Sequence, residues 1–196
     1  VVENVLLAMG YKVYDCGLSS TPSMFMSIIN YDVDAAIEIT ASHLPMNMNG
    51  LKFFTREGGF SGDDIKAILA RASTKVWTKG DFKGTTEKLD NMAKYCEDLR
   101  EMIKKGVNAP DYDQPLKGLK IVVDPSNGVG EFYITDVLNP LGADTSGSIA
   151  VHPDGRFPTH QPNPENKAAM DLISEATKKA NGDLGIIFDT DCDRSA

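Results

Sequence analysis

A short apolar run followed at once by a cluster of acids is the feature that most constrains this chain. Residues 184–188 (LGIIF) carry no charge, and the next six residues are DTDCDR. Such a run is typical of a strand buried on both faces, as strands are in helix-covered parallel sheets. We therefore expect the three aspartates at the carboxyl end of a strand, where open α/β sheets bind their ligands.

A second junction of the same kind lies in the first half of the chain. Residues 33–39 (VDAAIEI) predict another buried strand, and TASHLPMNMNGLK follows it. This segment carries a hydroxyl, an imidazole and an ammonium group, on Ser42, His43 and Lys52, where we expect the strand to end in a parallel sheet. We expect the polar side chains of this segment to take part in binding or catalysis rather than to form part of the core.

Helical and strand-like periodicities alternate along the chain. We predict helices over residues 1–9, 22–30, 63–72, 86–105, 128–138 and 163–179. We predict strands over residues 11–16, 33–39, 53–54, 119–124, 143–149 and 184–188. This order favours parallel sheets with crossover helices, and the proline-containing residues 108–118 predict a linker. We expect an α/β fold with two three-layer α/β domains, residues 1–107 and 108–196, whose mixed sheets are mainly parallel.

Composition excludes several classes of function. The 196 residues carry a net charge of −8, so nucleic acid, whose phosphate backbone needs a basic face, is not an expected partner. No apolar run approaches the length of a membrane span, and we expect no membrane association. Three widely spaced cysteines predict a reducing, cytoplasmic compartment rather than a disulfide framework.

The acidic loop predicts a metal site. Asp189, Asp191 and Asp193 alternate along an extended segment, so their carboxylates point to one side and repel one another unless a cation lies between them. Hard oxygen ligands favour Mg²⁺ or Ca²⁺, with Mn²⁺ as a third choice. An EF-hand is excluded because Arg194 stands at the sixth position, where that loop needs glycine. A merely solvated acidic turn would not explain the buried strand before it.

Several types of chemistry remain open at this point. Acyl transfer is disfavoured because Ser42 and His43 are adjacent, and neighbouring side chains diverge on extended backbone. A haloacid-dehalogenase-like phosphatase would use Asp189 as its nucleophile, but that leaves Arg194 and the TASH segment without a role. A non-enzymatic metal- or phosphate-binding module is a further alternative. Phosphoryl transfer needs a carrier oxygen, a metal, cations and a base, which the two junctions together contain.

The motifs resemble those of the α-D-phosphohexomutases, the phosphoglucomutase and phosphomannomutase family. T-A-S-H-x-P, then N-G-x-K, then D-x-D-x-D-R occur in the family's order. Three further segments are similar to family motifs: residues 17–22 (GLSSTP), residues 124–128 (DPSNG) and residues 154–165, which contain GRFP and PNPE. The resemblance covers nearly the whole chain.

The resemblance implies a role for each candidate residue. Ser42 would be the phosphoserine that gives its phosphoryl group to a sugar phosphate and takes one back from a bisphosphorylated intermediate. Arg194 would hold the phosphate, and His43 and Lys52 would be candidates for proton transfer and charge stabilisation. The metal ion, Mg²⁺, would be bound by the phosphorylated serine and the three loop aspartates: Ser42, Asp189, Asp191 and Asp193.

The resemblance also implies what else the protein would need. Its substrates would be a hexose phosphate and a hexose bisphosphate, with the phosphoryl group moving between the 1- and 6-positions. Family members have four domains, and we expect this chain to be most of domain 1 and nearly all of domain 2. Its partners would then be the missing domains 3 and 4 of the same chain. We expect the present residues to have little mutase activity alone, and the sugar stays open among glucose, mannose and an amino sugar.

Some positions depart from the family's pattern or lie outside it. Leu44 replaces a frequent asparagine, and Thr190 and Cys192 replace small residues that often separate the acids. We expect Cys192 to pack behind the loop. We expect His152 and His160, in the proline-rich loop, to lie on the surface. The lone Trp77 is expected in the core.

Overall fold

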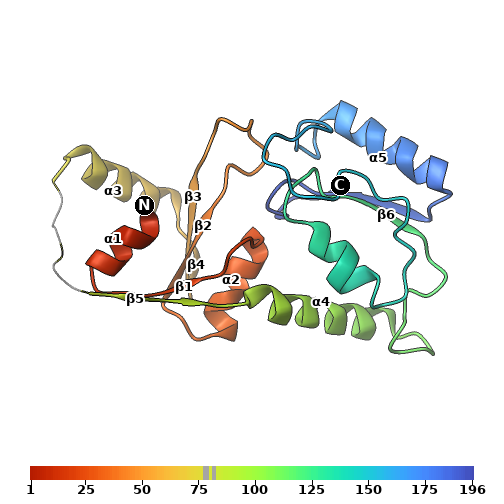
Figure 1. The fold of residues 1–196 in the computed structure, drawn as a ribbon, viewed down its shortest axis with the longest axis horizontal. Helices are drawn as coiled ribbons and strands as arrows, with labels where there is room; N and C mark the ends of the chain where they lie inside the picture. The colour runs from red at the N-terminus through yellow and green to blue at the C-terminus, as the bar shows by residue number, and fades with distance from the viewer. Residues whose placement is uncertain (77–79, 81–82) are drawn as a thin grey trace.

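The computed structural model describes residues 1–76, 80 and 83–196, so the expectation for Trp77 falls outside the described residues. It combines helices with parallel and antiparallel strands (Figure 1). The helices are α1 (Val2–Ala8), α2 (Thr21–Asn30), α3 (Gly62–Ser73), α4 (Asn91–Val107), the π-helix η1 (Tyr133–Leu138) and α5 (Lys167–Ala180). The strands are β1 (Lys12–Asp15), β2 (Ala35–Ile39), β3 (Leu51–Thr55), β4 (Gly58–Gly59), β5 (Thr85–Lys88), β6 (Ile121–Asp124) and β7 (Leu184–Ile187). In the described part of the chain, no helix is long and apolar enough to cross a membrane.

The pairing of β2 corrects one expectation. We expected this strand in a parallel sheet, but it pairs antiparallel with β3, which pairs antiparallel with β4. The reason is the connection: residues 40–50 contain no helix to carry the chain across the sheet, so β3 returns along β2. The register places Lys52 opposite Glu38, and this return brings Lys52 back beside the strand that leads to Ser42.

The long helix predicted over residues 86–105 is two elements. Residues 85–88 (TTEK) form β5, which pairs in parallel with β1, and α4 begins only at Asn91. Asp90 caps that helix by accepting a hydrogen bond from the backbone N–H of Ala93 at 3.0 Å. The two threonines of TTEK favour a strand because their branched side chains suit a pleated surface. The strand could not be predicted from local sequence because its partner β1 lies more than 70 residues earlier in the chain.

Two boundaries in the second half also differ from prediction. The strand expected over residues 143–149 is reduced to one isolated bridge between Lys120 and Asp144. Its remaining residues form a turn, in which the Ser148 N–H donates to the Thr145 carbonyl at 3.0 Å. α5 begins at Lys167, after Asn166 has capped it, rather than at residue 163.

The main core lies in the second half of the chain. β6 and β7 pair in parallel, as expected, and β6 is buried along its whole length. The helix α4 brings Tyr95 and Cys96 into this core, where Tyr95 packs edge-on against Phe132. At its first residue α4 also contacts the first half of the chain, because the buried Asn91 hydrogen-bonds Ser19 and Ser23. Figure 1 shows α4 continuing the line of β5 toward the second half of the molecule, so one helix is packed against both parts.

His160 contradicts its predicted surface position. Its side chain is only 5% exposed, and Nε2 lies 2.8 Å from Oδ2 of the fully buried Asp124 at the end of β6. Its Nδ1 lies 2.8 Å from the carbonyl oxygen of Gln161. The hydrogen bond with Asp124 raises the pKa of His160 against the opposing effect of burial. The pair therefore ties the proline-rich loop to the end of a core strand. His152 is 87% exposed, as expected.

This pair predicts a pH dependence of stability. Because the pKa of His160 is raised in the folded protein, its contribution is fully present below the unfolded value of about 6.5 and is lost as pH rises through the folded value. Removing one partner of a buried pair costs about 3 kcal/mol, so we expect His160→Ala to lower the free energy of unfolding by about that amount at pH 6.

Urea unfolding at about pH 6 and about pH 8 measures this effect. The exposed His152→Ala variant is the matched control and should change stability little. A His160→Ala variant whose stability equals that of the unmodified protein at both pH values would contradict the assignment.

Candidate functional site

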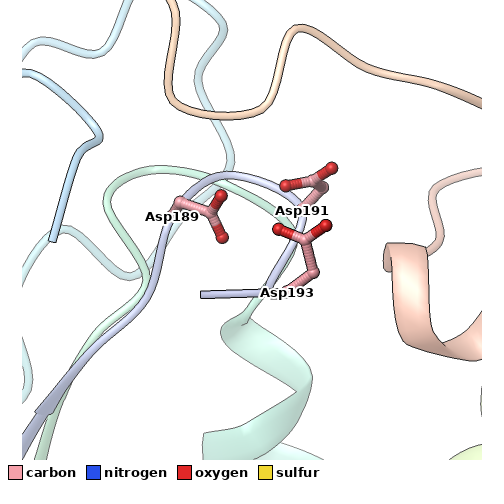
Figure 2. Close-up of side chains that lie close together, drawn as sticks. All are labelled: Asp189, Asp191 and Asp193. Atoms are coloured by element: carbon pink, nitrogen blue, oxygen red, sulfur yellow. The ribbon is translucent and has the colours of Figure 1, made fainter. Parts of the chain in front are cut away.

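The three aspartates of the acidic loop converge at the end of β7. One carboxylate oxygen from each of Asp189, Asp191 and Asp193 lies within 4.8 Å of the other two. Figure 2 shows their side chains gathered at the turn of the loop. Asp189 and Asp191 are buried, and Asp193 is exposed. The sequence-predicted cluster therefore forms, with one side open to solvent.

The turn after β6 sets the position of this loop. The Val129 N–H donates to the Thr190 carbonyl at 2.8 Å, and the hydroxyl of Ser126 donates to the Phe188 carbonyl. A Cβ atom on Gly128 would lie 2.4 Å from the backbone of Thr190, so only glycine permits this approach. Cys192 packs behind the loop at 5% exposure, as predicted.

Ser42 meets the acidic loop from the first half of the chain. Its Oγ donates to Oδ2 of Asp189 at 2.9 Å. Its backbone is left-handed, with φ at 52°, and its N–H donates to Oγ1 of Thr40 at 2.8 Å. His43 Nδ1 lies 3.4 Å from the Ser42 Oγ, which corrects the expectation that the two side chains diverge. The divergence rule assumes extended backbone, and Ser42 is not extended.

Lys52 bridges two of the aspartates. Its Nζ lies 2.7 Å from Oδ2 of Asp191 and 2.6 Å from Oδ2 of Asp193. Burial lowers the pKa of Lys52, but these two hydrogen bonds outweigh that effect and raise it above the usual value. Glu38, opposite Lys52 on β2, has its pKa raised to about 8, chiefly by burial and then by the charge of Asp191. The ammonium group therefore sits among several carboxyl groups.

The aspartates differ in protonation behaviour because their partners differ. Burial, and then the charge of Asp191, raise the pKa of Asp189 to about 6. Burial acts in the same direction on Asp191, but hydrogen bonds from Lys52 and Thr21 lower its pKa below the usual value. Crowded carboxylates of this kind are stabilised by positive charge.

The cluster fits a hard cation. Oδ1 of Asp191 is buried and has no hydrogen-bond partner among the described residues. A buried carboxylate oxygen without a partner is costly, and a metal ion would satisfy it. All the converging atoms are carboxylate oxygens, which Mg²⁺, Ca²⁺ and Mn²⁺ prefer. The residues present are therefore suitable ligands for a divalent metal ion.

Thr21 is a site residue that the sequence reasoning missed. Its Oγ1 donates to Oδ2 of Asp191 at 2.7 Å, and its N–H donates to the Asp191 carbonyl at 2.9 Å. It stands at the first position of α2, where Ser20 and Ser23 form a capping box. The GLSSTP segment was recognisable as a motif, but a hydroxyl aimed at a loop 170 residues away leaves no local signal.

Arg194 is the predicted site residue that is least connected. Its backbone N–H donates to Oδ1 of Asp189 at 3.2 Å, which helps to close the loop. Its side chain is exposed and makes no hydrogen bond or ion pair with the residues that the structure describes. The contacts therefore bring Ser42, His43, Lys52 and the aspartates together, and leave the Arg194 guanidinium free of them.

Comparison with known proteins matches both halves of the chain. Residues 1–78 match the family model "Phosphoglucomutase/phosphomannomutase, alpha/beta/alpha domain I", and residues 93–196 match domain II of the same family. The chain is 33% identical to a phosphomannomutase of Escherichia coli, over 96% of this chain and 42% of that protein. It is 30% identical to a probable phosphoglucosamine mutase of Methanosphaera stadtmanae, over 99% of this chain and 42% of that protein.

A solved structure supports the same relationship. The chain is similar to a phosphoglucomutase/phosphomannomutase family protein from Burkholderia thailandensis, with a TM-score of 0.76 and 28% identity. The match covers 97% of this chain and 40% of that one. The chain thus spans well under half of the proteins it matches. The observed α/β elements agree with the α/β/α domains named by the two family models.

The contact from Thr21 yields a stability prediction. Thr21→Val removes a buried hydrogen bond to a carboxylate while keeping the shape of the side chain, and such bonds contribute about 1.5–3 kcal/mol. We expect the free energy of unfolding to fall by about 2 kcal/mol in metal-free buffer, measured by urea denaturation. Thr21→Ser keeps the hydroxyl and should lose less; equal losses in both variants would show that the hydroxyl is not responsible.

Proposed function

Because the chain belongs to the phosphoglucomutase/phosphomannomutase family, we propose that it supplies the phosphoserine and metal-binding half of a phosphohexomutase. One observation carries the proposal: the Ser42 Oγ lies 2.9 Å from Oδ2 of Asp189, at the edge of the three-aspartate cluster. A phosphoryl group on that oxygen would stand beside the carboxylates, where a divalent cation is needed to balance the charge.

The proposed reaction moves a phosphoryl group between Ser42 and a hexose phosphate. The serine O–P bond breaks as an O–P bond to a sugar hydroxyl forms, and the hydroxyl proton passes to a base. The bisphosphorylated sugar then returns its other phosphoryl group to Ser42. The net result is transfer between the 1- and 6-positions. The substrates would be hexose phosphates and a hexose bisphosphate.

His43 and Lys52 are the proposed groups for proton transfer and charge stabilisation. His43 Nδ1 is 3.4 Å from the Ser42 Oγ, close enough to accept a proton from a group at that oxygen or to donate one to it. Lys52 contacts Asp191 and Asp193, and there its charge would stabilise a transferring phosphoryl group. Arg194, with its free guanidinium on the same loop, is the proposed phosphate-binding residue.

Mg²⁺ is the proposed metal. Asp189, Asp191 and Asp193 would hold it together with an oxygen of phosphorylated Ser42. When bound, the ion would neutralise charge on the phosphoryl oxygens. The unpartnered Oδ1 of Asp191 supports a cation at this cluster, while the choice of Mg²⁺ over Mn²⁺ or Ca²⁺ rests on the family resemblance.

The extent of the chain limits what it would do alone. It covers about 42% of the curated relatives, and we propose that domains beyond it complete the site and choose the sugar. The names of the relatives include glucosamine, mannose and glucose enzymes, so they do not select one. We retain the division into residues 1–107 and 108–196 as a proposal, with α4 as the helix that contacts both parts.

Phosphate labelling of Ser42 tests the proposed function. After incubation with glucose 1,6-bisphosphate and Mg²⁺, we expect the whole protein, with the domains proposed to complete the site, to gain one phosphate, and its Ser42→Ala variant to gain none. Intact-mass analysis and peptide mapping measure this. Ser146→Ala removes an exposed serine that also lies in a turn. It is the control and should be labelled normally.

The same experiment separates the phosphatase alternative. An aspartate nucleophile would give an acyl phosphate on Asp189 that persists in Ser42→Ala and disappears in Asp189→Asn. That pattern would contradict the mutase proposal. The structure favours the serine, because Asp189 is fully buried and both its oxygens accept hydrogen bonds, from Ser42 and from Arg194.

Removal of a ligand tests the metal site. We expect Asp191→Asn to weaken Mn²⁺ and Mg²⁺ binding by about tenfold or more, because it replaces a charged ligand by a neutral one. Isothermal titration calorimetry measures the affinity directly, without activity. Asp171→Asn on the exposed face of α5 is the matched control and should bind like the unmodified protein. Equal affinity in both variants would place the metal elsewhere.

A further inference from the structure

Thr190 makes a contact that the metal site itself does not require. It stands between two of the clustered aspartates, yet its side chain turns toward the other half of the chain. Its Oγ1 donates to the backbone carbonyl of Ser42 at 2.6 Å. This bond joins residues that are 148 positions apart, and both are partly buried.

The carbonyl that accepts this bond belongs to a residue in an unfavourable conformation. Ser42 has φ at 52°, a left-handed backbone that residues other than glycine rarely adopt. Such a conformation persists only where its surroundings hold it. Two hydrogen bonds do so here: the Ser42 N–H donates to Thr40, and the Ser42 carbonyl accepts from Thr190.

The backbone of Thr190 is itself held in place. Its carbonyl accepts from the Val129 N–H at 2.8 Å, and Gly128 approaches this backbone too closely for any side chain there. The turn after β6 therefore restrains the Thr190 backbone independently of the serine loop. From this restrained position Thr190 donates its hydrogen bond to the Ser42 carbonyl.

We propose that Thr190 is a positioning residue that holds Ser42 in its left-handed conformation, so that the Ser42 Oγ is aimed at Asp189. The proposal rests on the function proposed above. The bond fixes the carrier oxygen and the metal loop relative to each other before any ligand binds.

A pair of substitutions separates the hydroxyl from the rest of the side chain. Thr190→Val keeps the shape and removes the donor, whereas Thr190→Ser keeps the donor. In the whole protein, with glucose 1,6-bisphosphate and Mg²⁺, we expect Thr190→Val to slow phosphorylation of Ser42 by about tenfold, the factor expected from one hydrogen bond. Thr190→Ser should stay within about threefold of the unmodified protein. Quenched-flow sampling and intact-mass analysis give the rates.

A second measurement distinguishes positioning of the serine from damage to the metal loop. Affinity for Mn²⁺, by calorimetry, should change by less than about threefold in Thr190→Val, because the threonine side chain supplies no metal ligand. The ¹³C chemical shift of the Ser42 carbonyl should change in Thr190→Val and stay close to the original in Thr190→Ser. This signal reports the hydrogen bond without any turnover.

Three results would overturn the proposal. The first is an unchanged phosphorylation rate in Thr190→Val. The second is an equal loss in Thr190→Val and Thr190→Ser, which would assign the effect to packing. The third is a loss of Mn²⁺ affinity as large as the loss of rate. A whole, unmodified protein that never acquires phosphate on Ser42 would instead reject the proposed function, and this proposal with it, so the two failures are distinguishable.

Discussion

Mutual repulsion among the three carboxylates at the end of β7 is the constraint on which the rest of the site depends. Asp189 and Asp191 are buried within hydrogen-bonding reach of the other half of the chain, and that half supplies the groups that make their burial tolerable. Lys52 contributes a charge, and Thr21 and Ser42 contribute hydroxyl donors. The first half of the chain thus supplies, to the buried carboxylates of the acidic loop, the donors and charge that water would otherwise supply.

Local signals in the sequence were sufficient to predict the two strand-to-loop junctions. The runs before Thr40 and Asp189 are short and mostly apolar, and β2 and β7 form there. Turn and cap residues likewise marked the helix that begins at Thr21. The candidate site residues could be named because hydroxyl, imidazole, ammonium and carboxylate groups stood together where a strand ends. These are properties of a few consecutive residues, and such properties are readable without a structure.

What could not be predicted depends on partners far apart in the chain. The direction of β2 is set by its pairing with β3, and β5 exists as a strand because β1 lies beside it. His160 was placed on the surface because a proline-rich loop is usually exposed, but a buried carboxylate at Asp124 offers it an ion pair. Thr21 has no local feature that would show which residue its hydroxyl meets.

The contacts between the two halves of the chain also determine how those halves can separate. Thr21 and Lys52 donate to Asp191 and Ser42 donates to Asp189, while Thr190 donates in the opposite direction, to the carbonyl of Ser42. Every one of these bonds joins one half to the other, so the two halves cannot separate until all of them are broken.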